Sequence, residues 1–216
     1  MIEHRGLAMR NAFVNCATQL TKDVAAALGT PIVCEKGCHW CCRQWTDATE
    51  DEAGAIAGWI AEERRDGNAV AHDIVGRLRD YLHQLSTRRR DAQWESIEDE
   101  DEKRDLHWDL GLYCPFLSKQ RECDVHELCP FVCRTYLVAG SADACMTGGR
   151  TRTVGTNFDA VFEDLMSSGA DAATKQAMQE GYRYQYHAFR QPTDLLPVLV
   201  ARELEAMTGE TFPQPV

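Results

Sequence analysis

The stretch "TDATEDEAGAIAGWIAEERRDG", residues 46–67, carries the signals for both ends of one α-helix. Thr49 and Glu52 form a capping-box pattern, in which each side chain bonds the backbone N–H of the other residue. Acidic residues fill the first turn and arginines fill the last turn before Gly67, which suits the polarity of the helix dipole. The segment therefore predicts a complete helix.

Apolar residues recur at helical spacing on both sides of this stretch. The segment 11–29 ends at Gly29, a common helix terminator. The segment 68–97 carries one apolar stripe, made of Val70, Ile74, Leu78, Leu82 and Leu85. Three further helices are predicted over residues 157–169, 171–189 and 193–209, the last with Pro197 at a kink or in its first turn. Because alternation with a period of two is nearly absent, we expect a mainly α fold with few or no strands.

Two regions between these helices differ in composition. The acidic run "EDEDEKRD", residues 98–105, is expected to be an exposed break. Residues 106–146 are rich in proline, glycine and cysteine, and they predict loops with short helical turns. We expect one domain over residues 1–150, with residues 151–216 as a helical extension that packs on it.

The net charge of −11 and the sequence pI near 5.1 argue against a nucleic-acid-binding surface, which needs a basic face. The basic run Arg88–Arg90 lies close to the acidic run and predicts a solvated helix surface. No apolar run approaches the roughly 18 residues of a membrane span, and the first residues lack the apolar core of a signal peptide. These observations predict a cytoplasmic protein whose partner, a protein or a small molecule, is unknown.

Ten cysteines are more than a chain of this length needs to hold its core together. Cys16 lies alone in the first helical segment and is expected to pack as a small hydrophobic residue. The others form two groups: Cys34, Cys38, Cys41 and Cys42, then Cys114, Cys123, Cys129 and Cys133, with Cys145 a little later. Since cytosolic thiols stay reduced, such clusters bind metal or perform redox chemistry more often than they form disulfides.

Zinc and iron–sulfur centres usually take four thiolates each. Adjacent side chains diverge on a helix or a strand, so Cys41 and Cys42 are expected to point apart, one of them toward another metal, ligand group or core. We therefore expect helix packing to bring the two cysteine groups together into one bipartite metal site. The C-x2-C spacing of Cys38 and Cys41 suits zinc. The Cys-Pro pairs at Cys114 and Cys129 suit iron–sulfur, which we prefer of the two.

Neighbouring residues have less specific patterns. His39 and His126 are expected to be hydrogen-bond partners of ligands or surface residues rather than ligands. Arg134 either offsets the charge of a thiolate cluster or lies on the surface. The spacing of the remaining polar residues predicts no catalytic residue.

Two other functions are open. The triad Cys34, Cys38 and Cys41, with Trp40 before the last cysteine, is spaced like the cluster loop of a radical-SAM enzyme. A radical-SAM core needs alternating strands and helices, which the helical patterns from residue 46 onward do not predict. A methylase that uses S-adenosylmethionine is excluded less firmly. The second alternative is a scaffold in which zinc holds helices together for a protein partner.

Three segments together resemble a known family: "VCEKGCHWCCRQ" (33–44), "TDATEDEAGAIAGWI" (46–60) and "CPFLSKQRECDVHELCPFVCRTY" (114–136). They resemble the YkgJ-type cysteine-cluster proteins, described as a zinc- or iron-chelating domain that also occurs in flagellin lysine N-methylases. The resemblance implies metal chelation by Cys34, Cys38, Cys41, Cys42, Cys114, Cys123 and Cys133. The chain departs from the family at His126, where a tyrosine is usual, and at Cys129, where an arginine precedes the proline. Cys145 is a reserve ligand on the same ground.

Overall fold

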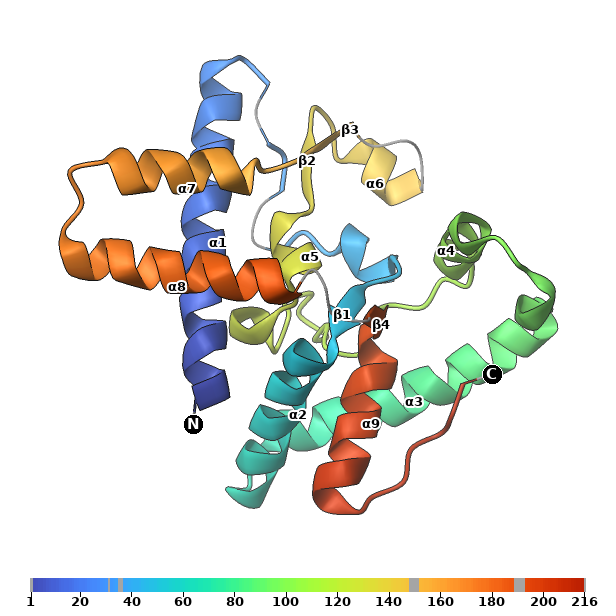
Figure 1. Cartoon of the computed structure of the whole chain (residues 1–216). Coiled ribbons are helices and arrows are strands. Elements are labelled where there is room, and N and C mark those ends of the chain that lie inside the picture. Colours follow the sequence, from blue (N-terminus) through green and yellow to red (C-terminus); the bar gives the residue numbers. More distant parts are fainter. Residues whose placement is uncertain (1, 31, 35–36, 148–151, 189–192, 216) are drawn as a thin grey trace. The chain divides into compact units, whose positions relative to one another are not determined.

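The computed structural model describes residues 2–30, 32–34, 37–147, 152–188 and 193–215. Within these ranges most residues belong to nine α-helices, and the four strands of three residues each form two antiparallel pairs (Figure 1). The predicted mainly α fold with few strands is confirmed. No helix in the described ranges has the length and apolar character needed to span a membrane.

The chain divides into two compact units, and each is assembled from two separate stretches of sequence. Unit 1 comprises Met1–Glu35 and Cys129–Pro192, and unit 2 comprises Lys36–Leu128 and Thr193–Val216. The boundary predicted at residue 150 falls among residues 148–151, outside the described residues.

Unit 1 is built on a long first helix. Helix α1 (Ile2–Ala27) ends near Gly29, as predicted, and Gly29 has the left-handed conformation (φ +70) that favours glycine. The remaining elements are α5 (Phe131–Thr135), β2 (Leu137–Ala139), α6 (Asp143–Thr147), β3 (Arg152–Val154), α7 (Phe158–Ser167) and α8 (Ala172–Ala188). Strands β2 and β3 pair antiparallel, with Val138 opposite Thr153.

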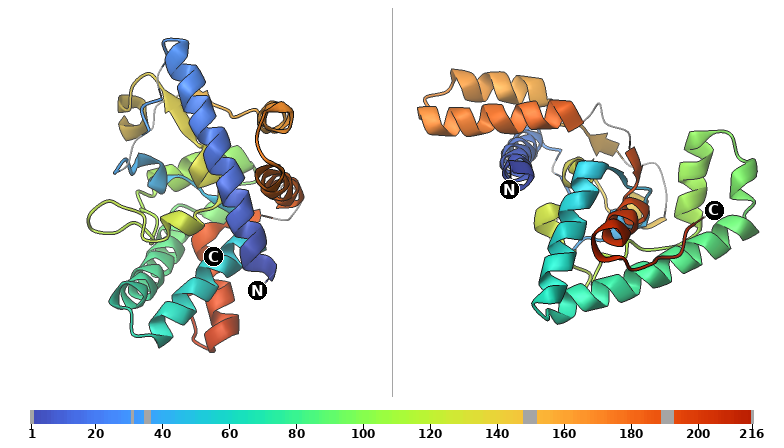
Figure 2. Two further views of the ribbon diagram at one scale, coloured as in Figure 1. Left: turned by 90° about the vertical axis from the view of Figure 1, so that its left-hand side faces the viewer. Right: turned by 60° about the horizontal axis from the view of Figure 1, so that its bottom comes forward.

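Helix α8 packs against α1, and Figures 1 and 2 show that it runs across α1 rather than alongside it. The core between the helices of unit 1 contains the fully buried Phe13, Val14 and Ala17. Gly181 permits the close approach of α8 to α1, because a Cβ at this position would overlap the carbonyl group of Met9. Glycine at this position therefore allows the short distance between the two helices.

Unit 2 contains the elements nearest to five of the seven cysteines predicted as ligands. These are the 3-10 turn η1 (Trp40–Arg43), β1 (Asp47–Thr49), α2 (Glu50–Arg65), α3 (Ala69–Asp91), the 3-10 turn η2 (Trp94–Ser96), α4 (Glu100–Asp109), the 3-10 turn η3 (His126–Leu128), β4 (Thr193–Leu195) and α9 (Leu196–Thr208). Strand β1 pairs antiparallel with β4, with Ala48 opposite Asp194. Helix α2 packs on α9 and on α3.

The predicted capping box is present. The Thr49 hydroxyl accepts a hydrogen bond from the Glu52 N–H at 3.3 Å, and the Glu52 carboxylate accepts one from the Thr49 N–H at 2.9 Å. In the C-terminal stretch of unit 2, Pro197 lies in the first turn of α9, where its missing N–H has no helical partner to lose. Gly209 closes α9 in the left-handed conformation.

Four expectations need correction. The acidic run is not a break but the start of α4: the Asp99 side chain caps the helix by accepting from the Glu102 N–H at 2.9 Å, and acids suit a helix N-terminus. Val70 does not share the buried stripe, since it is 45% exposed while the other four positions are buried. Cys16 is exposed rather than packed. Arg89, within the basic run, is only 7% exposed, because it continues the stripe of α3 one turn beyond Leu85.

Candidate thiol site

The first part of the candidate site is the 3-10 turn η1, which carries Cys41 and Cys42 side by side. The turn is closed by hydrogen bonds from the Cys42 N–H to the His39 carbonyl and from the Gln44 N–H to the Cys41 carbonyl, each 3.0 Å long. In this tight turn the two thiols lie close enough for Cys42 to hydrogen-bond Cys41. The expectation that one of the two faces another metal, ligand group or core stays a prediction.

The second part is the loop from Cys114 to Cys123, which closes on itself. The Ser118 N–H donates to the Glu122 carbonyl at 2.8 Å, and Leu117 forms an isolated antiparallel bridge with Cys123. Both cysteines are half-buried and pack against the apolar core of unit 2. The loop therefore presents its two cysteines from one compact piece of backbone.

The two parts meet directly. The N–H of Cys114 donates a hydrogen bond of 2.7 Å to the carbonyl oxygen of Cys42. Tyr113 adds a second connection, because its ring lies 5.8 Å from that of His39 and 5.7 Å from the guanidinium carbon of Arg43. Cysteines that are some seventy positions apart in sequence thus share one backbone hydrogen bond.

The thiols of the site differ in their pKa values. The hydrogen bond from Cys42 lowers the pKa of Cys41 to about 7, against the opposing effect of burial. The pKa of Cys114 is raised to about 12, mainly by burial and also by negative charge on Cys123 and on Cys41, while the Phe116 backbone and Arg77 act in the opposite direction. One thiol of the group is therefore easily ionised, and each added thiolate makes the next harder to form.

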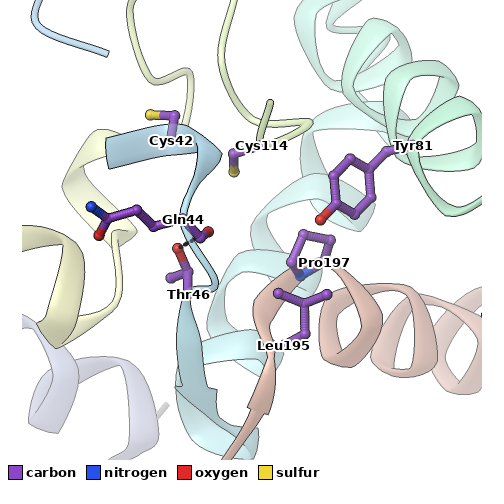
Figure 3. A pocket seen from close by; sticks show the side chains of 7 residues that line it. All are labelled: Cys42, Gln44, Thr46, Tyr81, Cys114, Leu195 and Pro197. Carbon is purple, nitrogen blue, oxygen red and sulfur yellow. Dashed lines mark hydrogen bonds between the residues drawn. The ribbon is translucent and has the colours of Figure 1, made fainter. Parts of the chain in front are cut away.

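A cavity of about 10 Å³ lies beside this meeting point. Figure 3 shows the side chains that line it: Cys42, Gln44, Thr46, Tyr81, Cys114, Leu195 and Pro197. A space of this size has room for about one water molecule. The buried hydroxyl of Tyr81 lies 3.4 Å from Nε2 of His107, and burial lowers the pKa of His107 to about 4, assisted by the charge of Arg89.

Stacked side chains anchor the chain that leaves the cysteine turn. The Trp45 and Trp94 rings stack at 5.7 Å, and the guanidinium carbon of Arg89 lies 4.2 Å from the Trp94 ring and 5.3 Å from the Trp45 ring. Arg43, next to Cys42, lies over the Trp108 ring at 4.5 Å and donates to the Trp108 carbonyl at 3.2 Å. Cation–π contacts of this kind fix the backbone on the C-terminal side of the two thiols.

The seven cysteines predicted as ligands divide between the units. Five belong to unit 2: Cys38, Cys41, Cys42, Cys114 and Cys123. The other two belong to unit 1, where Cys133 is exposed and the sulfur of Cys34 accepts a hydrogen bond of 3.2 Å from the Val138 N–H.

The reserve candidates lie in varied surroundings. Cys129 and Cys145 are buried in unit 1. His39 is buried and stacks on Trp40, with ring centroids 4.7 Å apart, whereas the His126 side chain is exposed. Arg134 is not a surface residue: it is buried, donates to the Cys129 carbonyl at 3.3 Å and to the Asn15 side chain at 2.8 Å.

Among the described residues, no three or more His, Cys, Asp or Glu side chains are grouped so that they could hold a metal ion. In the view of Figure 3 the sulfur atoms of Cys42 and Cys114 point in different directions, although their backbones are joined by a hydrogen bond. The backbone therefore brings Cys42 and Cys114 together, but their sulfur atoms do not point toward a common centre.

Comparison of the chain with protein-family models, with curated proteins and with solved structures gives no match. The likeness to YkgJ-type proteins consequently stays a prediction.

Several residues around the thiols were not singled out from the sequence. Arg77, Tyr81 and Arg89 all lie on α3, and Tyr113 directly precedes Cys114. Helical spacing in α3 could have predicted that Tyr81 and Arg89 are buried, because they lie three, four or seven residues from members of the apolar stripe. Such polar and charged residues on a buried helix face usually have a specific partner.

Proposed function

We propose that the protein binds zinc or iron, the latter as an iron–sulfur centre, through thiolates of its two cysteine groups. Cys41, Cys42, Cys114 and Cys123 in unit 2 form the nucleus of this site. The observation that carries the proposal is the 2.7 Å hydrogen bond between Cys114 and Cys42, which joins the two groups. Thiolate is the ligand that both kinds of centre prefer.

The side chains of these residues are suitable metal ligands, but their sulfur atoms are not positioned around a common centre. Four thiols from two short segments supply a suitable donor set, but in the part of the chain that the structure describes they are not grouped as a metal site. Rotation about χ1 moves a cysteine sulfur among three staggered positions. Metal binding would therefore require new rotamers on a backbone that already brings the four residues together.

Electrostatics supports the same proposal. Burial and neighbouring negative charge raise the pKa of Cys114 to about 12, so a cluster of thiolates without a cation is unfavourable. A bound cation reverses this effect, because it attracts every thiolate of the cluster at once. The site would then serve redox chemistry with iron–sulfur, or metal handling or structural support with zinc, in a reducing compartment such as the cytoplasm. None of the ten cysteines, all of which lie within the described residues, forms a disulfide bond.

The proposal is tested by metal analysis and an optical spectrum of full-length protein purified without oxygen. We expect stoichiometric zinc in a colourless protein, or iron and sulfide in a brown one. Separate replacement of Cys41, Cys42, Cys114 and Cys123 by serine should lower the metal content, while Cys16→Ser, at an exposed position outside both groups, should not. Protein that contains no metal and takes up neither Zn²⁺ nor an iron–sulfur centre on reconstitution would contradict the proposal.

A further inference from the structure

We propose that Arg77 is a positioning residue of the thiol site: through its ion pair with Asp124 it holds Cys123 within reach of the Cys41–Cys42 turn. This inference rests on the proposed metal binding and adds the residue that organises one half of the site.

The guanidinium of Arg77 reaches from α3 to the cysteine loop. Its Nη2 lies 2.5 Å from the carboxylate of Asp124, and its Nη1 lies 3.2 Å from that of Asp73. The side chains of Arg77 and Asp124 are only 20% and 19% exposed, whereas Asp73 is 55% exposed. Screening by water is therefore weaker for the Arg77–Asp124 pair, which makes it the stronger of the two interactions.

Asp124 follows Cys123 directly, and the backbone around them is tied to the rest of the loop. The Asp124 N–H donates to the Phe116 carbonyl at 2.9 Å, and Cys123 is bridged to Leu117. Fixing the Asp124 side chain on α3 thus also fixes the backbone of Cys123.

The loop consequently has one attachment near each of its cysteines. Cys114 is attached to the η1 turn by its hydrogen bond to Cys42, and Cys123 is attached to α3 by the neighbouring Asp124. Without the Arg77 pair, the Cys123 end would lose its attachment to α3 and keep its backbone bonds, such as that from the His126 N–H to the Cys123 carbonyl, and its packing on the core. The loop would still exist, but its second thiol would no longer be held at a defined distance from Cys41 and Cys42.

Co²⁺ is a suitable probe, because it accepts the same thiolate ligands as zinc and its thiolate charge-transfer absorbance reports how many thiolates are bound. We expect Arg77→Gln to weaken Co²⁺ binding by the full-length, anaerobically purified protein about 10- to 100-fold, the usual loss when a residue that orients a ligand is removed. Its charge-transfer absorbance per Co²⁺ should also fall, because Cys123 contributes less. Arg77→Lys, which keeps the charge and one donor to Asp124, should recover most of the affinity.

The route through Asp124 is tested by a double-mutant cycle. If Arg77 acts through this carboxylate, Asp124→Asn alone and the double variant with Arg77→Gln should show about the same loss as Arg77→Gln alone. Additive losses would overturn the assigned route.

Arg79→Gln is the matched control. Arg79 lies two residues farther along α3 and also pairs with a carboxylate, that of Glu210, away from the cysteine loop. This control should lose thermal stability as metal-free protein without losing Co²⁺ affinity. Equal Co²⁺ affinity of Arg77→Gln, Arg79→Gln and wild-type protein would overturn the inference while the proposed function stands. Failure of the wild-type protein itself to bind Co²⁺ would contradict the metal site and this inference together.

Discussion

The hydrogen bond from Cys42 lowers the pKa of Cys41 to about 7, so the Cys41 thiolate forms more readily than that of an ordinary cysteine. The sequence placed the two cysteines next to each other, and the structure holds both in the 3-10 turn η1, where the Cys42 thiol hydrogen-bonds Cys41. At the residue scale, this contact sets the chemistry of Cys41.

Removing the Cys42 thiol, which donates this hydrogen bond, should raise the pKa of Cys41 again. In metal-free Cys42→Ala protein we expect the pKa of Cys41 to rise toward its ordinary value of 9.0, so that the thiolate forms at higher pH. The rate of Cys41 alkylation by iodoacetamide at pH 7 should then fall about fivefold, since a smaller thiolate fraction is partly offset by a more nucleophilic thiolate. Rates measured by peptide mass spectrometry from pH 5 to 10 check this.

Exposed Cys16 is the internal reference in the same experiment, because its alkylation should be the same in both proteins. If the pH of half-maximal Cys41 alkylation is the same in Cys42→Ala as in wild-type protein, Cys42 does not stabilise the Cys41 thiolate.

Helix α2 shows what local signals achieve at the scale of one element. Its capping box, acidic first turn and basic last turn were all readable in residues 49–67, and each is present in the structure. Helix α4 shows the limit of the same reasoning. Its acids were interpreted as an exposed break, but Asp99 and the helix dipole make such a run a favourable start.

Loss of the capping box should destabilise unit 2. Thr49 is buried, and Thr49→Ala removes the acceptor of the Glu52 N–H, so we expect the free energy of unfolding to fall by about 1–2 kcal/mol. Urea unfolding followed by far-ultraviolet circular dichroism measures this change. Thr49→Ser keeps the hydroxyl and should lose much less; equal losses in the two variants would assign the effect to the methyl group instead.

At the scale of the whole molecule, the chain forms two discontinuous units. Unit 2 closes only when residues 193–216 return to pair β4 with β1 and to pack α9 on α2. The sequence predicted each of these helices but not their pairing, because helical periodicity marks a buried face without naming its partner.

Weakening α9 should therefore act on unit 2 selectively. Leu204 is fully buried in the core of unit 2, and Leu204→Ala should cost about 2–5 kcal/mol through lost burial and the cavity left behind. We expect hydrogen exchange to accelerate in peptides from α2, α3 and α9 and to stay unchanged in those from α1 and α8. Uniform acceleration along the chain would show that the two units unfold together.

The sequence by itself determined the helical class, most helix positions and the grouping of the cysteines, because helix signals and cysteine spacing are local. Only the tertiary structure decided that Cys114 lies against Cys42, that Arg77 holds the loop of Cys123, and that the buried Arg89 lies against Trp45. Each of these contacts joins residues far apart in the chain, and packing of apolar faces selects them. No spacing rule specifies which of several apolar faces will meet.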